Sequence, residues 1–360
     1  MISTYSGGDQ FLRRWSLVVY GGGGGTALEL SAGSSSAFGG PASTGPSGEP
    51  LAEGLRIKFR TVAADRGVPN HGEFTVYNCS DATAQRVMNK EFSRVVLQAG
   101  YVQGKFGVIF DGTIKQVKRG RESAVDTYIL IYASDGDYFN TQYAIANPLY
   151  MQRASTAQER FKALQDDAVK NAGLQAGPIE GLTGGILPRG KVLWGMGNQN
   201  MDTTASPFAQ WSIQNGAIQT RPIKGYLPGE AVVLNAHSGL IGTPEATDQG
   251  VFAVALLNPA VKVGGLAKIN NAGINTSEPA VAATSIQQLG YPGFSDINLV
   301  ASTSADGTYV ILVVEYEGDS RGNPFYMKLA MLLQDTSSGE IAPGAPALPP
   351  VGGPTSPSHL

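Results

Sequence analysis

The sequence predicts a mainly β fold, with two β-barrel domains of similar size joined by a small helix-containing connector domain. Three observations predict it. Glycine and proline contribute 47 and 21 of the 360 residues, more than average, which favours turns over long helices. Short runs of β-branched and aromatic residues recur with turn residues between them. One clearly helical segment separates these runs into two sets, so we expect two β domains.

The first set of runs lies within residues 1–150 and predicts the first barrel. An alternating run covers residues 15–20, and the stretch 31–54 is a Gly/Ser-rich insertion that we expect to be a flexible loop. Ser80 and Asp81 are N-cap residues ahead of a short predicted helix over 82–90. The other strand-like runs are Leu55–Val62, Gly72–Asn78, Arg94–Tyr101, Phe106–Arg119 and Thr127–Ala133.

Residues 151–229 predict the connector, which is irregular apart from one amphipathic helix. We expect this helix to begin at Ser155 as N-cap, with Gln158 at the capping-box position, and to run to Asn171 before Gly173 stops it. Apolar residues at 161, 164, 168 and 169 have the spacing of one helix face.

The second barrel is predicted over residues 230–335, and the remainder, 336–360, is a Pro-rich tail that we expect to be disordered. The strand-like runs of this set are Ala231–Leu234, Gly250–Leu257, Leu266–Ile269, Asp296–Ser302, Thr308–Tyr316 and Phe325–Leu333.

Charge and cysteine content narrow the function classes. Lysine and arginine number 26 against 29 acidic residues, so nothing in the net charge of −3 attracts nucleic acid or an anionic membrane. The single cysteine, Cys79, excludes an internal disulfide framework and fits folding in a reducing compartment. The N-terminus lacks the pattern of a signal peptide, and no apolar run reaches the length of a membrane span. We therefore expect a soluble protein that assembles in the cytosol.

Two glycine-rich segments approach nucleotide-binding motifs without matching them. Gly185–Lys191 has the spacing of a phosphate-binding loop, but Val192 stands where the magnesium-binding Ser or Thr belongs, and Pro188 removes an amide. Gly195–Asn200 lacks the third glycine of the dinucleotide fingerprint. Both segments are predicted to be loops, and we expect no cofactor.

The remaining polar motifs also favour structural roles. The three histidines, His71, His237 and His359, are not at metal-ligand spacing. Asp135 and Asp137 lack the other ligands of a calcium loop and predict a turn, and Cys79 is expected to pack at a strand end. A catalytic triad stays open, since its members meet only in space, but the Gly-x-Ser-x-Gly elbow is absent. We expect no metal site and no enzyme.

A basic cluster on one predicted strand is the candidate interface: Lys115, Lys118, Arg119 and Arg121. One interpretation is a solvated strand face; the other is a wall facing phosphate or an acidic partner. Lys115 and Lys118 are an odd number of residues apart, so they point to opposite faces unless a bulge realigns them. We expect one of these basic residues to meet a carboxylate of an adjoining subunit or partner protein.

Several segments resemble phage baseplate hub proteins, the central hubs of tailed bacteriophages, and the similarity spans roughly residues 11–333. In the first half the resemblance rests on Leu55–Phe59, Phe74–Ser80, Val96–Tyr101, Val108–Ile114 and Tyr132–Asp137. In the second half it rests on His237–Glu245, Thr247, Gly250–Val251, Leu256–Pro259, Asp306–Tyr309 and Gly318–Pro324. The insertion 31–54 and the Pro-rich tail depart from the family pattern.

The resemblance implies two tail-tube-like β-barrels per subunit and a virion component of the tail baseplate, assembled in the host cytoplasm. A homotrimer would present six barrels to the hexameric tail tube protein and meet a trimeric central spike protein, with baseplate wedge or other tail-tip proteins as further partners. Phage DNA would pass through its channel without specific binding. The alternative is a cell-wall-binding or cell-wall-degrading tail-tip protein. A glycosidase needs two carboxylates that converge in a cleft, whereas Glu315 and Glu317 lie on one strand face.

Overall fold

The computed structural model describes residues 13–21, 27–30, 55–101, 104–235, 237–247, 250–270 and 306–334. The predictions for the insertion 31–54, the run 296–302, His359 and the Pro-rich tail fall outside these residues. Most of the described strands belong to one mixed sheet, in which antiparallel pairing dominates. The predicted mainly β class is confirmed, although the sheet is open at its ends rather than closed on itself.

The first half of the sheet contains the strands expected from the first set of runs and one short strand, β2 (Ala27–Glu29), that was not predicted. Its helix α1 (Asp81–Met88) begins after Ser80, whose hydroxyl accepts a hydrogen bond from the Thr83 amide, so the predicted N-cap is confirmed. The strands are β1 (Arg13–Gly21), β2 (Ala27–Glu29), β3 (Ile57–Ala64), β4 (Asn70–Tyr77), β5 (Phe92–Tyr101), β6 (Phe106–Arg121) and β7 (Thr127–Asp135).

The second half contains one strand that the sequence analysis did not predict. This strand, β14, carries the proline Pro244 next to an irregular register with its neighbour, which weakens the alternating strand pattern. The strands are β13 (Val232–Leu234), β14 (Leu240–Thr247), β15 (Gly250–Leu256), β16 (Leu266–Asn270), β17 (Asp306–Asp319) and β18 (Phe325–Leu333).

Both halves have the same strand order. The order β3-β4-β7-β6-β5 in the first half matches β14-β15-β18-β17-β16 in the second, and every neighbouring pair in both is antiparallel. The long strands β6 and β17 each contain a register shift of one residue against the hairpin partner, at Lys115 and at Leu312. We call these five-strand sets the first and second repeats.

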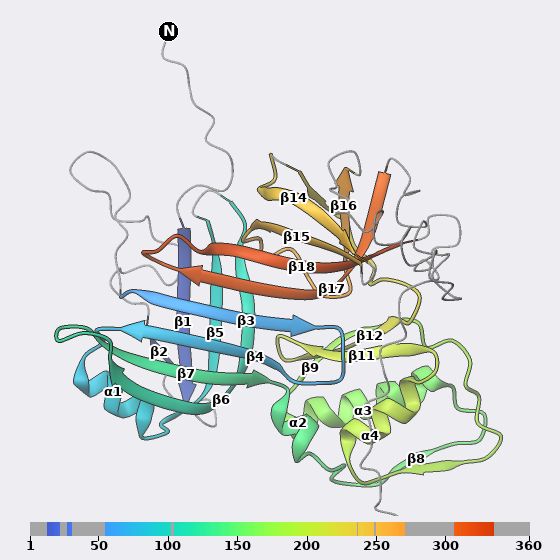
Figure 1. Cartoon of the computed structure of the whole chain (residues 1–360). Helices are drawn as coiled ribbons and strands as arrows, with labels where there is room; N and C mark the ends of the chain where they lie inside the picture. The colour runs from blue at the N-terminus through green and yellow to red at the C-terminus, as the bar shows by residue number, and fades with distance from the viewer. Residues whose placement is uncertain are drawn as a thin grey trace, which may run out of the picture.

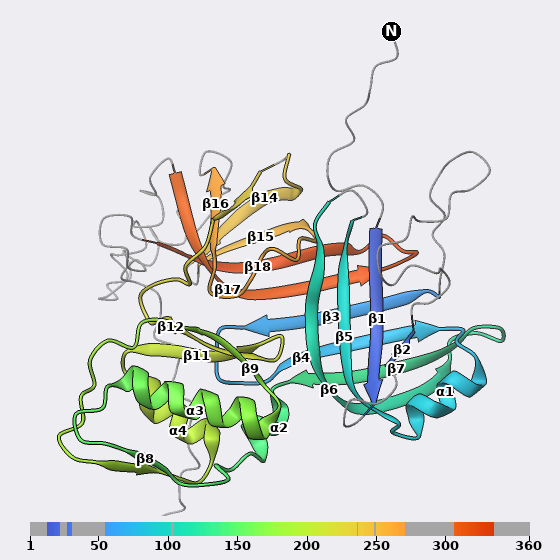
Figure 2. The ribbon, with the colours of Figure 1, turned by 180° about the vertical axis from the view of Figure 1, so that it is seen from behind.

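The two repeats join edge to edge in a continuous sheet. The second part of β17, Val313–Asp319, pairs antiparallel with β3 over Lys58–Ala64 (Figure 1). One apolar core includes residues of both repeats, such as Phe74 and Tyr309. Seen from behind, β1, β5 and the beginning of β6 cross the layer of β3, β4 and β7 at a steep angle (Figure 2), so the first repeat folds over its own core.

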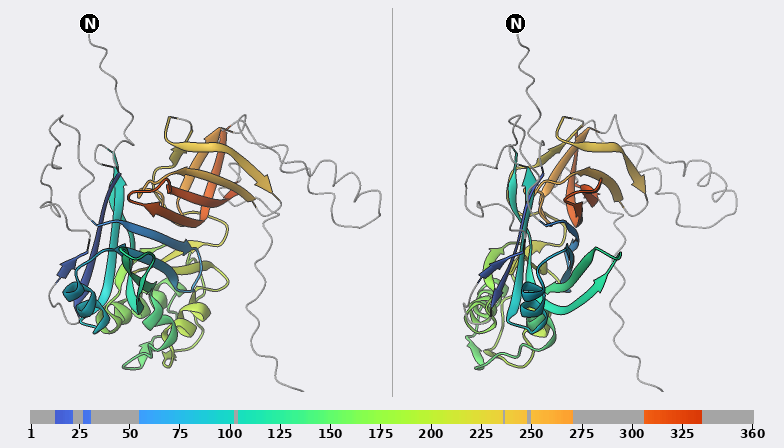
Figure 3. Two further views of the ribbon diagram at one scale, coloured as in Figure 1. Left: turned by 60° about the vertical axis from the view of Figure 1, so that its left-hand side comes forward. Right: turned by 90° about the vertical axis from the view of Figure 1, so that its left-hand side faces the viewer.

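The helix-containing part has a core of its own around Phe139, Phe161 and Trp211 and lies at one end of the molecule, away from β14 and β16 (Figure 3). Helix α3 begins after its N-cap residue Thr156, and Thr156 forms a capping box with Glu159. The helix ends at Gly173, which has a left-handed conformation. The prediction of Ser155 as N-cap and Gln158 as its partner is therefore wrong by one residue. The elements are α2 (Asp137–Thr141), β8 (Leu149–Met151), α3 (Ala157–Ala172), β9 (Gln175–Ile179), β10 (Lys191–Leu193), α4 (Gly197–Ala205), β11 (Ala209–Gln214) and β12 (Ala217–Pro222).

Candidate interaction surface

The basic cluster lies on the second part of β6, where the strand bulges. Ile114 pairs with Ala133 and Gln116 with Tyr132, so Lys115 is the extra residue of a β-bulge. The bulge changes the alternation, and Ile114 and Val117, three residues apart, both pack against the core. Lys118 consequently lies on the outer face and Arg119 on the face that carries Ile129. The bulge restores a consistent apolar face that strict alternation would have lost.

Two of the four basic residues are engaged within the chain. Lys115 forms an ion pair with Asp137, the first residue of α2, and Arg119 forms one with Asp81, the first residue of α1. Each carboxylate sits at a helix N-terminus, where negative charge is favourable. These contacts tie the bulged strand to the two helices that flank it, so neither residue requires an intermolecular carboxylate.

The other two basic residues have no carboxylate partner among the described residues. The Lys118 ammonium lies 5.2 Å from the centroid of the Tyr132 ring, a cation–π contact on an exposed face. The Arg121 guanidinium has only a 3.4 Å contact to the carbonyl of Ala124. Within the predicted cluster, Lys115 and Arg119 thus form ion pairs inside the chain, whereas Lys118 and Arg121 form none with the described residues.

Glu315 and Glu317 do share one face of β17, as predicted, and basic side chains of the neighbouring strands neutralise them. Arg60 Nε lies 2.6 Å from Glu315 Oε1 across the β17–β3 junction, and Lys328 Nζ lies 3.0 Å from Glu317 Oε2. Both carboxylates are engaged in cross-strand ion pairs. This arrangement fits a structural role better than a general acid and base pair.

The segment with phosphate-loop spacing lies against the N-terminal end of α3. The Leu187 amide donates to the Ser155 carbonyl, and the buried Arg160 of α3 donates to the Gly185 carbonyl. Strand β10 follows at Lys191, where a phosphate-binding loop would open a helix. The second glycine-rich segment was predicted as a loop, and here the structure differs, because α4 begins at Gly197.

Cys79 is the second residue after β4 and packs against the core, as predicted for a strand end. Burial raises the pKa of its thiol. Over the described ranges there is no group of three or more His, Cys, Asp or Glu side chains that could hold a metal ion. Within the same ranges, no helix combines the length and apolar character needed to cross a membrane.

A set of buried charged groups that the sequence analysis missed links the helix-containing part to the sheet. Arg221 at the end of β12 donates from Nε to Asp65 Oδ2 at 2.7 Å, and both side chains are almost fully buried. Burial raises the pKa of Asp65, and the charge of Arg221 opposes that rise. Their signal in the sequence is weak, because single charged residues at strand ends are common in exposed turns.

Asp135, at the end of β7, is the second buried acid of this junction. Its Oδ1 accepts a hydrogen bond of 3.0 Å from the Gly216 amide, and its side chain is 2% exposed. Burial raises the pKa of Asp135 to about 7, with the nearby Asp111 carboxylate adding to the effect. The predicted turn after this residue is present as the left-handed Gly136, but the acid itself faces the interior.

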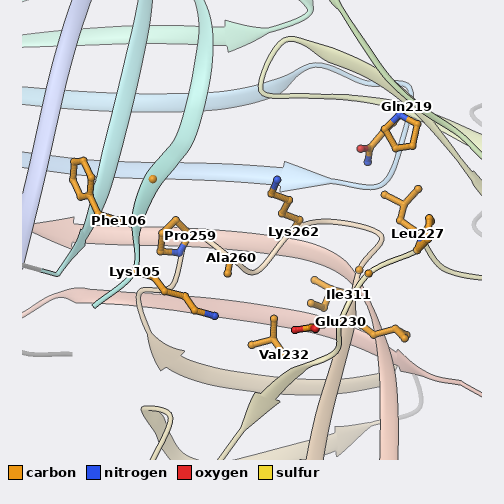
Figure 4. A pocket seen from close by; sticks show the side chains of 16 residues that line it. Lys105, Phe106, Gln219, Leu227, Glu230, Val232, Pro259, Ala260, Lys262 and Ile311 are labelled. Atoms are coloured by element: carbon orange, nitrogen blue, oxygen red, sulfur yellow. The ribbon is translucent and has the colours of Figure 1, made fainter. Parts of the chain in front are cut away.

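A cavity of about 710 Å³ opens between the two repeats and the helix-containing part. Lys105 and Phe106 line it from the start of β6, Val232 from β13 and Pro259 from the segment after β15 (Figure 4). Glu230 is the one carboxylate among the described residues that line it, so this part of the lining holds no carboxylate pair of the kind that a glycosidase uses.

Two comparisons by sequence find no match. No protein-family model matches the chain, and no curated protein matches it either.

Comparison by structure finds tail proteins. A tail protein from Neisseria meningitidis MC58 has a TM-score of 0.50 at 9% identity, covering 90% of this chain and 97% of that one. A 43 kDa tail protein of prophage MuSo2 from Shewanella oneidensis has a TM-score of 0.47 at 8% identity, covering 91% and 99%. An Escherichia coli component of the type VI secretion system, described as similar to bacteriophage T4 tail proteins, has 0.46 at 9% identity, covering 81% and 76%. On the first of these matches, the chain shares the fold of a known tail protein over nearly its whole length.

Proposed function

We propose that this chain is a structural subunit of a tail hub, in which three copies join a six-fold tail tube to a three-fold spike. The observation that carries the proposal is the repeated strand order within one chain. Two equivalent repeats per copy give six equivalent units in a trimer, which is what a three-fold protein needs to face a six-fold ring. The fold shared with a tail protein supports the same assignment.

In this proposal the repeats are two tube-like barrel domains, near residues 1–150 and 230–335. Their open sheets become closed only in the assembly, where each repeat meets the next. Residues 151–229 form most of the connector domain, to which α2 adds Phe139, and its separate core lets it pack beside the ring without interrupting it. The tail tube protein, the central spike protein and baseplate wedge or other tail-tip proteins are the partners, and DNA passes through the channel without specific contacts.

The proposed role is non-enzymatic. The acids on β17 are neutralised in ion pairs, and the cavity between the repeats has one carboxylate in its described lining. The protein would be part of the virion tail and would be assembled in the host cytoplasm.

Size-exclusion chromatography with light scattering tests the proposal. We expect a particle with three times the 37.6 kDa mass of one chain. A monomer at all concentrations up to those of tail assembly would contradict it. A turbidity assay on purified cell walls forms the second arm, because clearing by the purified trimer would favour the cell-wall-degrading alternative over a scaffold.

A further inference from the structure

Two strand edges of the two repeats lack a partner strand among the described residues. The first part of β6 pairs with β5 up to Thr113, so the segment 114–121 has β7 on one side and no described strand on the other. Strand β14 ends the sheet and pairs only with β15 among the described strands. Unpaired edges carry free N–H and C=O groups that favour pairing with another chain.

The junction inside the chain shows how such edges can meet. The equivalent of β6 in the second repeat is β17, whose segment beyond the bulge pairs antiparallel with β3. The equivalent of β3 in the second repeat is β14, because both begin the repeated strand order. The pairing of β17 with β3 is therefore a template for pairing β6 of one copy with β14 of another.

The registers of the repeats identify the counterparts of the Glu315–Arg60 ion pair, which is diagonal because Arg60 lies directly opposite Glu317. Lys118 follows the bulge residue Lys115 by three positions, and Glu315 follows Leu312 by three positions, so Lys118 corresponds to Glu315. On the other side of the junction, the strand registers relate Arg60 of β3 to Glu245 of β14. Arg60 lies opposite Glu73, which faces Tyr132, the partner of the first residue after the bulge in β6.

Glu245 occupies the same place in the second repeat. It lies opposite Phe252, which faces Ala330, the partner of Val313, the first residue after the bulge in β17. Glu245 therefore corresponds to Arg60. Within the chain, the acid Glu315 on β17 bonds the base Arg60 on β3 at 2.6 Å.

We propose that Lys118 on β6 and Glu245 on β14 of a second copy form a cross-strand ion pair, the charge-reversed counterpart of Glu315–Arg60. The proposal rests on the proposed trimeric hub and names the contact that joins its copies. Because a β6 edge meets a β14 edge, the contact is heterologous, and repetition of it closes a ring. The partner is thus a second copy of this chain.

The charge reversal determines which edges can join. Strand β6 carries Lys118 and β3 carries Arg60, so pairing β6 with β3 of another copy would bring like charges together. Pairing β17 with β14 would likewise oppose Glu315 and Glu245. Like charges on facing strands are destabilising, so the charges disfavour these two pairings, and the β17 and β3 edges concerned already pair with each other within each copy.

Both residues are available for this contact. Lys118 and Glu245 are exposed, and neither has an ion-pair partner among the described residues. The neighbouring bases Lys115 and Arg119 are engaged with acids of their own chain. The charges that have no ion-pair partner among the described residues, those of Lys118 and Glu245, therefore lie at the two positions that the strand registers relate.

Charge reversal and its compensation test the pair. We compare wild type, Lys118→Glu, Glu245→Lys and the double variant by light scattering and sedimentation across a dilution series. Each single reversal should weaken each of three junctions about fivefold, which raises the protein concentration for half-assembly about tenfold. The double variant should return to within about twofold of wild type. The control Lys162→Glu changes an exposed lysine of α3 that pairs with Asp166, and it should leave assembly unchanged.

Zero-length carbodiimide coupling of the wild type keeps the test independent of variant folding. In trimers mixed from ¹⁴N- and ¹⁵N-labelled chains, mass spectrometry should find a Lys118–Glu245 amide that joins peptides of different label. A wild-type monomer would overturn the hub and this contact together. A stable trimer with unaffected single variants, an unrescued double variant or coupling only at other sites would overturn this contact while the trimeric hub stands.

Discussion

Replacing Asp135 by asparagine should remove a pH dependence from the stability of the protein. The Asp135 carboxyl is buried at the junction of the sheet and the helix-containing part, and burial raises its pKa from 3.8 to about 7. Between these two values the folded protein holds a proton that the unfolded chain has released. The free energy of unfolding of the wild type therefore falls as the pH rises through this window and levels off above pH 7.

The size of the effect follows from the pKa. One pKa unit corresponds to about 1.4 kcal/mol, so a rise of about three units makes the contribution about 4 kcal/mol between pH 4 and pH 8. Asparagine has nearly the shape of aspartic acid and keeps an oxygen that can accept the Gly216 amide at 3.0 Å. We expect the Asp135→Asn variant to lack this fall and to be more stable than the wild type at pH 8.

Urea unfolding at pH 5.0, 6.0, 7.0 and 8.0, at one protein concentration, measures the difference. The control is Asp166→Asn, which changes an exposed acid of α3 and should keep the wild-type pH profile. If Asp135→Asn and the wild type lose the same free energy between pH 5 and pH 8, the carboxyl ionises normally in the folded state and the reasoning is refuted.

Three further outcomes are expected. Arg221→Met should lower the free energy of unfolding at pH 8 by about 3–5 kcal/mol, because it leaves the buried Asp65 carboxylate unpaired; a loss below about 1 kcal/mol in urea unfolding would show that this pair is not desolvated. Thr156→Ala should cost about 1 kcal/mol by removing the α3 capping box, whereas Ser155→Ala should cost clearly less; equal losses would contradict Thr156 as the N-cap. Lys118→Glu should weaken assembly more than Lys115→Glu, because Lys115 pairs with Asp137 of its own chain; the reverse order in sedimentation would contradict this assignment.

The local elements were largely predictable because their signals lie within a few residues. The alternating run over 127–133 became β7, and Ser80 capped α1 through the Thr83 amide. The errors also have local causes. Two hydroxyl residues stand side by side at 155 and 156, and only the backbone decides which of them caps α3. Strand β14 carries a proline and an irregular register, so its alternation was not visible.

The candidate interface was predictable as a group of residues but not as an arrangement. The alternation of β6 showed that Lys115 and Lys118 could not share a face without a bulge, and the structure contains that bulge at Lys115. The acids that engage Lys115 and Arg119 lie at the starts of α2 and α1, 22 and 38 residues away in the chain. No pattern of neighbouring residues could identify such partners.

The sequence alone determined that the chain forms two sets of strands with a helical segment between them, because periodicity and capping act through neighbouring residues. Only the tertiary structure decided that the two sets share one strand order and that β17 joins β3. Strand pairing is made by backbone hydrogen bonds, which are the same for every residue except proline, so the sequence does not state which edges meet. The roles of the charges can be assigned only after the edges are placed: Glu315 forms a diagonal ion pair with Arg60 inside the chain, whereas Lys118 and Glu245 lie at edges that have no described partner strand.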